Sequence, residues 1–136
     1  MKAALIQLNS SDQPVENIQQ TVEYMQEAAA KGATFLLTPE VTNCVSESRS
    51  HQQTVLHLEA DDPTLSALKK EANALGVWLL IGSLALKTGD ADGRFANRSF
   101  MISPKGDVVA RYDKIHMFDV ELDKSETYKE SAGYRP

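Results

Sequence analysis

The sequence predicts an α/β domain built around a mixed sheet, and three observations lead to this prediction. Apolar runs of strand length alternate with two amphipathic helical stripes, as in parallel strands joined by helices. Two clusters of turn residues then separate the last apolar runs, which is typical of an antiparallel meander. The chain has 136 residues, of which 42% are hydrophobic and 24% charged, so it suits a single domain over residues 1–136.

The first elements form a strand, a helix and a second strand. Residues 2–8 are a short apolar run suited to a buried strand. Pro14 fits the first turn of a helix that ends before Gly32, and Pro39 ends a second strand over residues 34–38. The apolar stripe of the helix recurs at spacings of three and four, at Val15, Ile18, Val22, Met25 and Ala29.

The next elements are a loop, a second helix and a strand. Residues 42–50 are polar and rich in serine, which favours a loop that can hold a short helix. Asp62 and Pro63 suit a cap and a first turn, and Gly76 closes the helix. Its apolar stripe comprises Leu65, Leu68, Ala72 and Leu75. Residues 77–81 are apolar throughout, so we expect a strand covered on both faces.

The remaining runs, 84–87, 95–102 and 108–112, are separated by turn clusters at 89–93 and 103–107. The order predicts a mainly parallel sheet with antiparallel strands added at one side. Ligand sites of such sheets lie at the carboxyl ends of the strands.

Composition excludes several classes of partner and cofactor. Lysine and arginine total 14 against 19 acidic residues, the net charge is −5, and there is no basic run, so we expect no nucleic acid. The apolar stretch at the N-terminus is too short for a secretory signal or a membrane span, which favours a cytoplasmic protein without a membrane partner. We find no phosphate-binding glycine motif and no metal-ligand spacing of histidines, and therefore expect no cofactor and no metal.

Two charged residues follow strand-like runs directly. Glu40 comes after Thr38 and Pro39, and Lys114 follows the run that ends at Tyr112. A buried carboxylate and a buried ammonium are costly unless each has a partner or a chemical task, so the pair suggests an active site at the sheet rim. Each residue taken alone also fits a solvated loop.

The surrounding motifs resemble the nitrilase (carbon-nitrogen hydrolase) superfamily over the whole chain. They are Leu-Leu-Thr-Pro-Glu at 36–40, Leu-Ile-Gly-Ser at 80–83, Asn-Arg-Ser-Phe at 97–100 and Arg-Tyr-Asp-Lys-Ile-His-Met-Phe-Asp at 111–119. Within the superfamily, these motifs are similar to those of the small amidases that include deaminated glutathione amidase and omega-amidase. The resemblance implies the N-terminal half of an α-β-β-α sandwich, with a mixed sheet and two main helices on one face.

The resemblance also implies roles for three residues. Glu40 would be the general base and acid, Lys114 would face the tetrahedral oxyanion, and Glu130 would orient the lysine and the substrate. For Glu130 a surface position in a polar loop is equally open, because the flanking Lys129 and Glu126 look solvated. The implied reaction is hydrolysis of a small linear carboxamide to acid and ammonia through a cysteine thioester, without a cofactor.

The family's nucleophilic cysteine has no counterpart among these residues. Cys44 matches a family position that is not the nucleophile, and a small, partly buried thiol is its simpler interpretation. We therefore expect a fragment that is inactive alone and whose inner sheet face needs cover from the rest of the protein or another copy. The full-length form is expected to be a homo-oligomer, as is common in the family.

Two other functions remain open at this stage. One is a non-catalytic truncated paralogue that acts as an interaction or assembly partner. The other is a small flavodoxin-like ligand-binding module, which the missing phosphate-binding loop disfavours.

Overall fold

The computed structural model describes residues 1–121 and 127–136 of the chain. The strands are β1 (Ala3–Leu5), β2 (Phe35–Leu37), β3 (Trp78–Lys87), β4 (Phe95–Ile102), β5 (Val108–Asp113), β6 (Asp119–Glu121) and β7 (Thr127–Lys129). The α-helices are α1 (Pro14–Ala30), α2 (Arg49–Val55) and α3 (Pro63–Leu75). Two 3-10 turns complete the set, η1 (Glu59–Asp61) and η2 (Glu130–Ala132).

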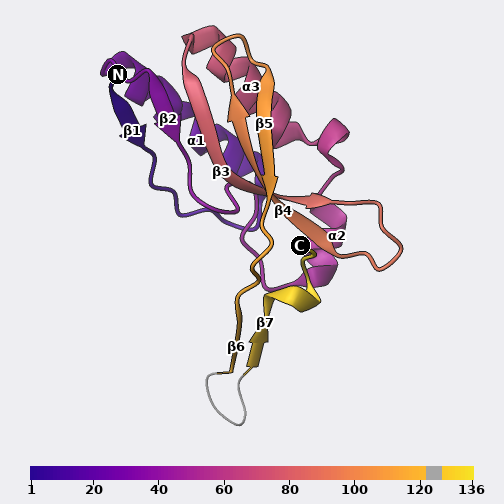
Figure 1. The fold of residues 1–136 in the computed structure, drawn as a ribbon. Coiled ribbons are helices and arrows are strands. Elements are labelled where there is room, and N and C mark those ends of the chain that lie inside the picture. Colours follow the sequence, from indigo (N-terminus) through magenta and orange to yellow (C-terminus); the bar gives the residue numbers. More distant parts are fainter. Residues whose placement is uncertain (122–126) are drawn as a thin grey trace.

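Five strands form one mixed sheet in the order β1-β2-β3-β4-β5 (Figure 1). The first three strands are parallel, and β4 and β5 are added antiparallel beyond β3. The predicted mixed sheet, parallel on one side and antiparallel on the other, is therefore confirmed. A separate two-stranded ribbon of β6 and β7 extends away from the sheet (Figure 1).

Helices α1 and α3 cover the same face of the sheet and form the main core with it. Paired positions across the sheet alternate between this covered face and an open one. Ala4, Leu36, Leu79 and Ile102 make one row across the strands, and the last three of them are fully buried. Met25, Leu68 and Ala72 pack on that side, as expected from the helical stripes.

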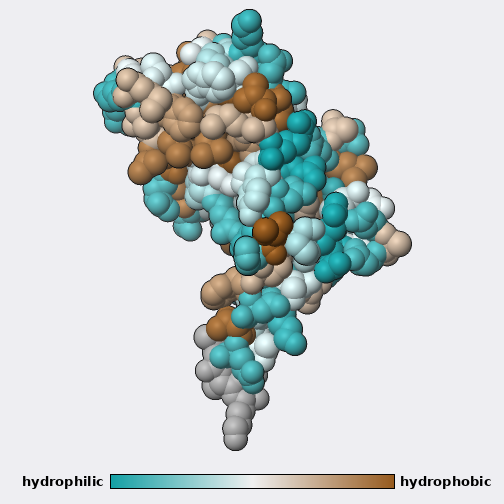
Figure 2. Space-filling view, viewed as in Figure 1, coloured by the Kyte–Doolittle hydropathy of each residue, from teal (hydrophilic) through white to brown (hydrophobic). Residues whose placement is uncertain are grey.

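The opposite face of the sheet is apolar and open. The neighbouring row contains Leu5, Leu37, Leu80 and Met101, and Leu5 is 82% exposed. Figure 2 shows brown, apolar surface over this part of the sheet. The expectation that residues 77–81 are covered on both faces is wrong, because helices lie on one side only and Trp78 is 40% exposed.

Two helices begin as predicted, but the stripe of α1 differs. Asp62 caps α3 by accepting a 2.7 Å bond from the Leu65 amide, and Gly76 ends that helix in the left-handed conformation.

In α1 the buried residues are Asn17, Thr21 and Met25, whereas Val15 is 77% exposed. Polar side chains can occupy that stripe because each finds a backbone partner. Asn17 Nδ2 donates to the carbonyls of Ser11 and Asn43, and Thr21 Oγ1 donates to that of Asn17.

Among the described residues, no helix has both the length and the apolar character needed to cross a membrane. The same residues contain no cluster of three histidine, cysteine or acidic side chains placed to hold a metal ion.

Candidate active site

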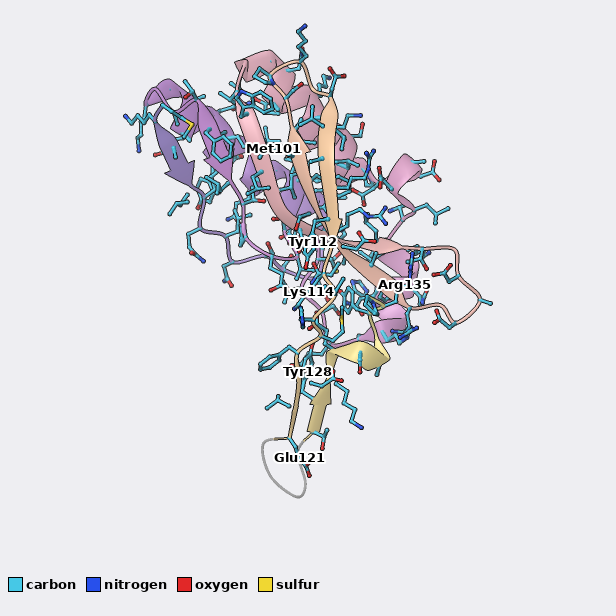
Figure 3. All side chains as sticks on the ribbon, in the orientation of Figure 1. Met101, Tyr112, Lys114, Glu121, Tyr128 and Arg135 are labelled. Atoms are coloured by element: carbon cyan, nitrogen blue, oxygen red, sulfur yellow. The ribbon has the colours of Figure 1, made fainter. Side chains whose placement is uncertain are left out.

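Three charged side chains from three separate segments meet at the junction between the sheet and the β6–β7 ribbon. Lys114 Nζ lies 3.0 Å from Glu40 Oε1 and 2.9 Å and 3.0 Å from the two carboxylate oxygens of Glu130. Figure 3 shows Lys114 at this junction, just beyond the end of β5. The three residues singled out in the sequence, Glu40, Lys114 and Glu130, therefore share one contact cluster, here named the charged cluster.

The members of the charged cluster differ widely in exposure. The side chain of Glu130 is 7% exposed, that of Lys114 29%, and that of Glu40 57%. The expectation that Glu40 is buried is therefore wrong for this structure, because Glu40 lies on a turn at the open rim of the sheet. Glu130 is the buried carboxylate of the cluster and not a surface residue. Glu126, which was expected to be solvated, lies outside the described residues.

The turn that carries Glu40 is tied to β3 by side-chain and backbone hydrogen bonds. The Val41 amide donates to Ser83 Oγ at 2.8 Å, and the Thr42 amide donates to the Ser83 carbonyl at 2.9 Å. Val41 has a φ of 50°, an uncommon value for a β-branched residue. Strain of this kind persists only where surrounding contacts hold it, and it clusters at functional sites.

Gly82 allows the same turn to lie against β3. A Cβ at this position would sit 2.3 Å from the Thr38 carbonyl oxygen and 2.5 Å from that of Pro39, closer than side-chain carbons approach. The pairing of β3 with β4 also shifts register between Ile81 and Leu84, around this glycine. An isolated glycine within a strand pattern is a signal for such a bulge or close backbone approach.

Asn97 on β4 joins Glu40 to Lys114. Its Nδ2 donates to Glu40 Oε1 at 2.7 Å, and its backbone carbonyl accepts from the Lys114 amide at 2.9 Å. In the sequence Asn97 stands out only as part of the Asn-Arg-Ser-Phe motif and not as a site residue. No pattern of spacing along the chain connects it with Glu40, because the contact depends on sheet register.

Hydrogen bonds and opposite charge decide the ionisation of the charged cluster. Partial burial opposes the ionised form of Glu40, but bonds from Lys114 and Asn97 outweigh it and hold the pKa of Glu40 below its usual range. Burial likewise disfavours charged Lys114, but bonds to Glu130 and Glu40 raise its pKa. Both residues are therefore ionised at neutral pH.

Glu130 is held by its backbone surroundings as well as by Lys114. It begins η2 directly after β7, and its Oε2 accepts from the Phe118 amide at 2.5 Å. The segment after η2 returns to β4, where the Phe95 amide donates to the Gly133 carbonyl at 2.8 Å. The ribbon and the returning segment thus position Glu130 from both sides, and neither was predicted from the sequence.

A second ion network lies beside the charged cluster, where β4 pairs with β5. Arg98 binds Asp113 through two bonds, of 2.5 Å and 2.8 Å, and reaches Glu59 at 2.6 Å. The two bonds from Arg98 are the main reason that the pKa of Asp113 is lowered. Because Arg98 and Asp113 adjoin Asn97 and Lys114 in sequence, the network fixes the strand register that brings Asn97 to Lys114.

The charged cluster borders a cavity of about 340 Å³. Its lining includes Glu40, Cys44, Asn97, Lys114, Tyr128 and Glu130. A second cavity of about 340 Å³ lies between β1 and α1, where the exposed ion pair joins Glu27 of α1 to Lys31, the C-cap residue of the same helix. In the first cavity a lysine, Lys114, makes direct hydrogen bonds to carboxylates from two other segments.

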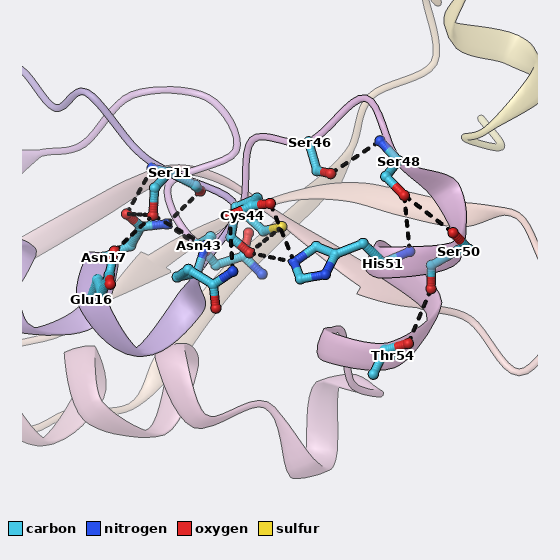
Figure 4. A network of polar contacts seen from close by, with 12 residues as sticks. Ser11, Glu16, Asn17, Asn43, Cys44, Ser46, Ser48, Ser50, His51 and Thr54 are labelled. Carbon is cyan, nitrogen blue, oxygen red and sulfur yellow. Dashed lines mark hydrogen bonds and ion pairs between the residues drawn. The ribbon is translucent and has the colours of Figure 1, made fainter.

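Cys44 is fully buried and takes part in a polar contact network that also includes His51 (Figure 4). Its Sγ lies 3.6 Å from the Asp12 carbonyl oxygen, to which His51 Nε2 also donates at 2.8 Å. Burial and the charge of Asp12 raise the pKa of the Cys44 thiol to about 11. Since the thiolate is the nucleophile, this cysteine is poorly suited to attack a substrate.

We therefore expect Cys44 to resist alkylation in the folded chain. At pH 8 its rate with iodoacetamide should be roughly two orders of magnitude below that of an ordinary cysteine with a pKa of about 8.5. Mass spectrometry of the chain with and without guanidinium chloride measures this difference, with the unfolded chain as the control. Equal rates in the two states would contradict the assignment of Cys44 as an inert thiol.

The arrangement combines kinds of group that acyl-transfer chemistry uses. It offers a carboxylate for proton transfer, an ammonium placed to stabilise a developing negative charge, and a buried second carboxylate that keeps the ammonium charged.

Comparisons with known proteins point in the same direction. A family model described as carbon-nitrogen hydrolase matches residues 2–135. The deaminated glutathione amidase of Yersinia enterocolitica is 31% identical over 98% of this chain, and nitrilase homolog 2 of Dictyostelium discoideum is 31% identical over 99% of it. The chain covers 46% and 40% of these two proteins, so it spans about half the length of the curated relatives it matches.

Solved structures share the fold over the whole chain. The crystal structure of the C. elegans NitFhit protein matches with a TM-score of 0.85 at 21% identity. The match covers 98% of this chain and 32% of the NitFhit chain. An amidase from Nesterenkonia sp. matches with a TM-score of 0.77 at 23% identity. The match covers 100% of this chain and 48% of the amidase chain. A glutamate-to-glutamine mutant of that amidase carries the product of Michael addition of acrylamide at its active-site cysteine.

Proposed function

The chain belongs to the carbon-nitrogen hydrolase family, and from this premise we propose that it supplies two catalytic groups, Glu40 and Lys114, for hydrolysis of a small linear carboxamide. The products are the carboxylic acid and ammonia, and the intermediate is a thioester. The nucleophilic cysteine comes from a part of the protein other than these 136 residues, because Cys44 is the one cysteine here and its thiol is buried with a raised pKa.

Each step assigns a proton or a charge to one group. Glu40 takes the proton of the attacking thiol while the sulfur bonds to the amide carbon and the carbonyl oxygen becomes negative. Lys114 stabilises that oxyanion. Glu40 then gives its proton to the departing ammonia, which leaves the acyl group on sulfur. In the second half, Glu40 takes a proton from water as the water attacks the thioester, and returns it to the sulfur as the acid departs.

The observation that carries this proposal is the contact of one lysine with two carboxylates beside a cavity. Two carboxylates around Lys114 raise its pKa, so its positive charge persists in the site. Glu130, at 7% exposure, anchors the ammonium through both of its oxygens, while Glu40 at 57% remains accessible to a substrate. This difference in exposure supports an orienting role for Glu130 and the proton-transfer role for Glu40.

Ammonia release from a panel of short linear primary amides tests the proposal. We expect turnover by the protein that joins this chain to a cysteine-bearing strand, and none by the 136 residues alone. Activity of the isolated chain would refute the need for an outside cysteine. Absence of turnover across the panel by the cysteine-bearing protein would refute the amidase function.

A second candidate is binding without catalysis, in which the chain acts as an assembly partner of a complete family member. The open sheet face, with Leu5 82% and Tyr112 55% exposed, favours it. Chromatography of the chain mixed with a complete family member discriminates the two functions. A stable complex that turns over amides no faster than the complete family member alone supports the binding role.

A further inference from the structure

Asn97 is almost fully buried and contacts both proposed catalytic residues. Its exposure is 2%, and it lies on β4 directly opposite Ala85 of β3. The side-chain amide reaches Glu40 at 2.7 Å, and the backbone carbonyl holds the Lys114 amide at 2.9 Å. One residue of a rigid central strand therefore fixes both groups relative to each other.

The two bonds to Glu40 end on the same oxygen. Asn97 Nδ2 and Lys114 Nζ both donate to Oε1, at 2.7 Å and 3.0 Å. Among residues 1–121 and 127–136, no group donates to Oε2. A carboxylate oxygen that already accepts two charge-assisted or amide bonds is the poorer proton acceptor, because its lone pairs are engaged. The unbound oxygen is the one free to receive a proton.

The other end of the Asn97 side chain gives a second, independent sign. Its Oδ1 is buried and has no hydrogen-bond partner in the part of the chain that the structure describes. Leaving such an atom unpaired is unfavourable for folding. The side-chain amide of Asn97 is therefore paired at the end that faces Glu40 and unpaired at the other.

We propose that Asn97 is a positioning residue that locks Glu40 Oε1 and thereby assigns proton transfer to Glu40 Oε2. The inference rests on the proposed function and adds to it the atom that carries the proton. Without Asn97, Glu40 can rotate about its terminal bond, so that Lys114 binds either oxygen and neither is reserved for proton transfer.

The test is a titration of Glu40 by carboxyl ¹³C NMR in the full chain, with Asn97→Ala and Asn97→Asp. Loss of the amide bond should raise the pKa of Glu40 by about half to one pH unit in Asn97→Ala. The isosteric Asn97→Asp should raise it further, because it places a second carboxylate beside the first. The acid limb of kcat/KM in the complete enzyme should move by the same amounts.

The titratable groups around Glu40 must be followed in the same experiment. They are Lys114 and Glu130 in the charged cluster, and Cys44, Tyr128 and Tyr134 in the cavity wall. Asn17→Ala is the matched control, since Asn17 is also a buried asparagine whose side-chain amide bonds to backbone carbonyls, here those of Ser11 and Asn43, and not to Glu40 or Lys114. It should lower stability and leave the pKa of Glu40 unchanged.

An unchanged pKa of Glu40 in both Asn97 variants would overturn the inference. A shift of equal size in Asn17→Ala would also overturn it, since the effect would then be merely structural. The titration requires no turnover, so it decides the positioning role even if the wild-type enzyme hydrolyses no amide. A wild-type enzyme that hydrolyses no amide would refute the proposed function and not the positioning role.

Discussion

Replacing Glu40 by glutamine should reduce amide hydrolysis by a factor on the order of a thousand or more. Glutamine keeps the size of the side chain and can still accept bonds from Asn97 and Lys114 through its carbonyl oxygen. It cannot take the thiol proton or return it to ammonia, so both halves of the reaction fail. The steady-state rate of ammonia release by the cysteine-bearing enzyme measures the loss.

Glu27→Gln is the matched control for this variant. Glu27 is also a carboxylate paired with a lysine, Lys31, and it also lies beside a cavity of about 340 Å³. That pair belongs to the surface of α1, so kcat should stay near the wild-type value. Comparable losses in the two variants would show that carboxylate removal acts through the fold and not through chemistry.

The second large effect is expected from Lys114→Met, which should reduce both turnover and stability. Loss of the cation that faces the oxyanion should lower kcat by about 10²–10³-fold. The substitution also leaves Glu130, at 7% exposure, without its counter-charge, and this should lower the free energy of unfolding by about 2–3 kcal/mol. Urea unfolding of the chain measures the stability change, and ammonia release measures the rate.

The double variant Lys114→Met with Glu130→Gln separates the two effects. Removing both charges should restore most of the lost stability but none of the activity, because the unpaired carboxylate is gone and the oxyanion still lacks its cation. Lys31→Met, which breaks the exposed pair with Glu27, should change neither quantity appreciably. A double variant as unstable as Lys114→Met would contradict the charge explanation.

The stability effect should also depend on pH with a defined sign. The pKa of Glu40 is lowered in the folded chain, so its contact with Lys114 stabilises the fold above the ordinary glutamate pKa of about 4.3. That contribution is lost as the pH falls through the lower folded value. The difference in free energy of unfolding between the wild-type chain and Lys114→Met should therefore become smaller in acid.

The elements that the sequence predicted are those with strong local signals. The two main helices have capping and proline signals at their starts and apolar repeats along their length, and both begin at the predicted prolines, Pro14 and Pro63. The strands of the main sheet were predicted from short apolar runs bounded by turn residues. The half-sandwich expected from the resemblance is confirmed at the level of fold, with structural neighbours that this chain matches over its whole length.

The parts that were missed depend on contacts between distant segments. Residues 127–135 form β7, η2 and a return to β4, yet their sequence is polar and reads as a loop, because they are held by backbone bonds and by Glu130. Asn97 and Arg98 act through sheet register, which local patterns do not specify. Gly82 is the exception, since a glycine within an apolar strand run could have indicated the close approach of the Glu40 turn.

The most direct test of the account is the pKa of Glu40 measured by carboxyl NMR in the wild-type chain and in Lys114→Met. Contact between the two side chains requires a value below the ordinary glutamate range in the wild type and a clear rise when the ammonium is removed. An identical titration curve in the two proteins would mean that Glu40 and Lys114 do not share a site, and the proposed division of catalytic roles would then fail.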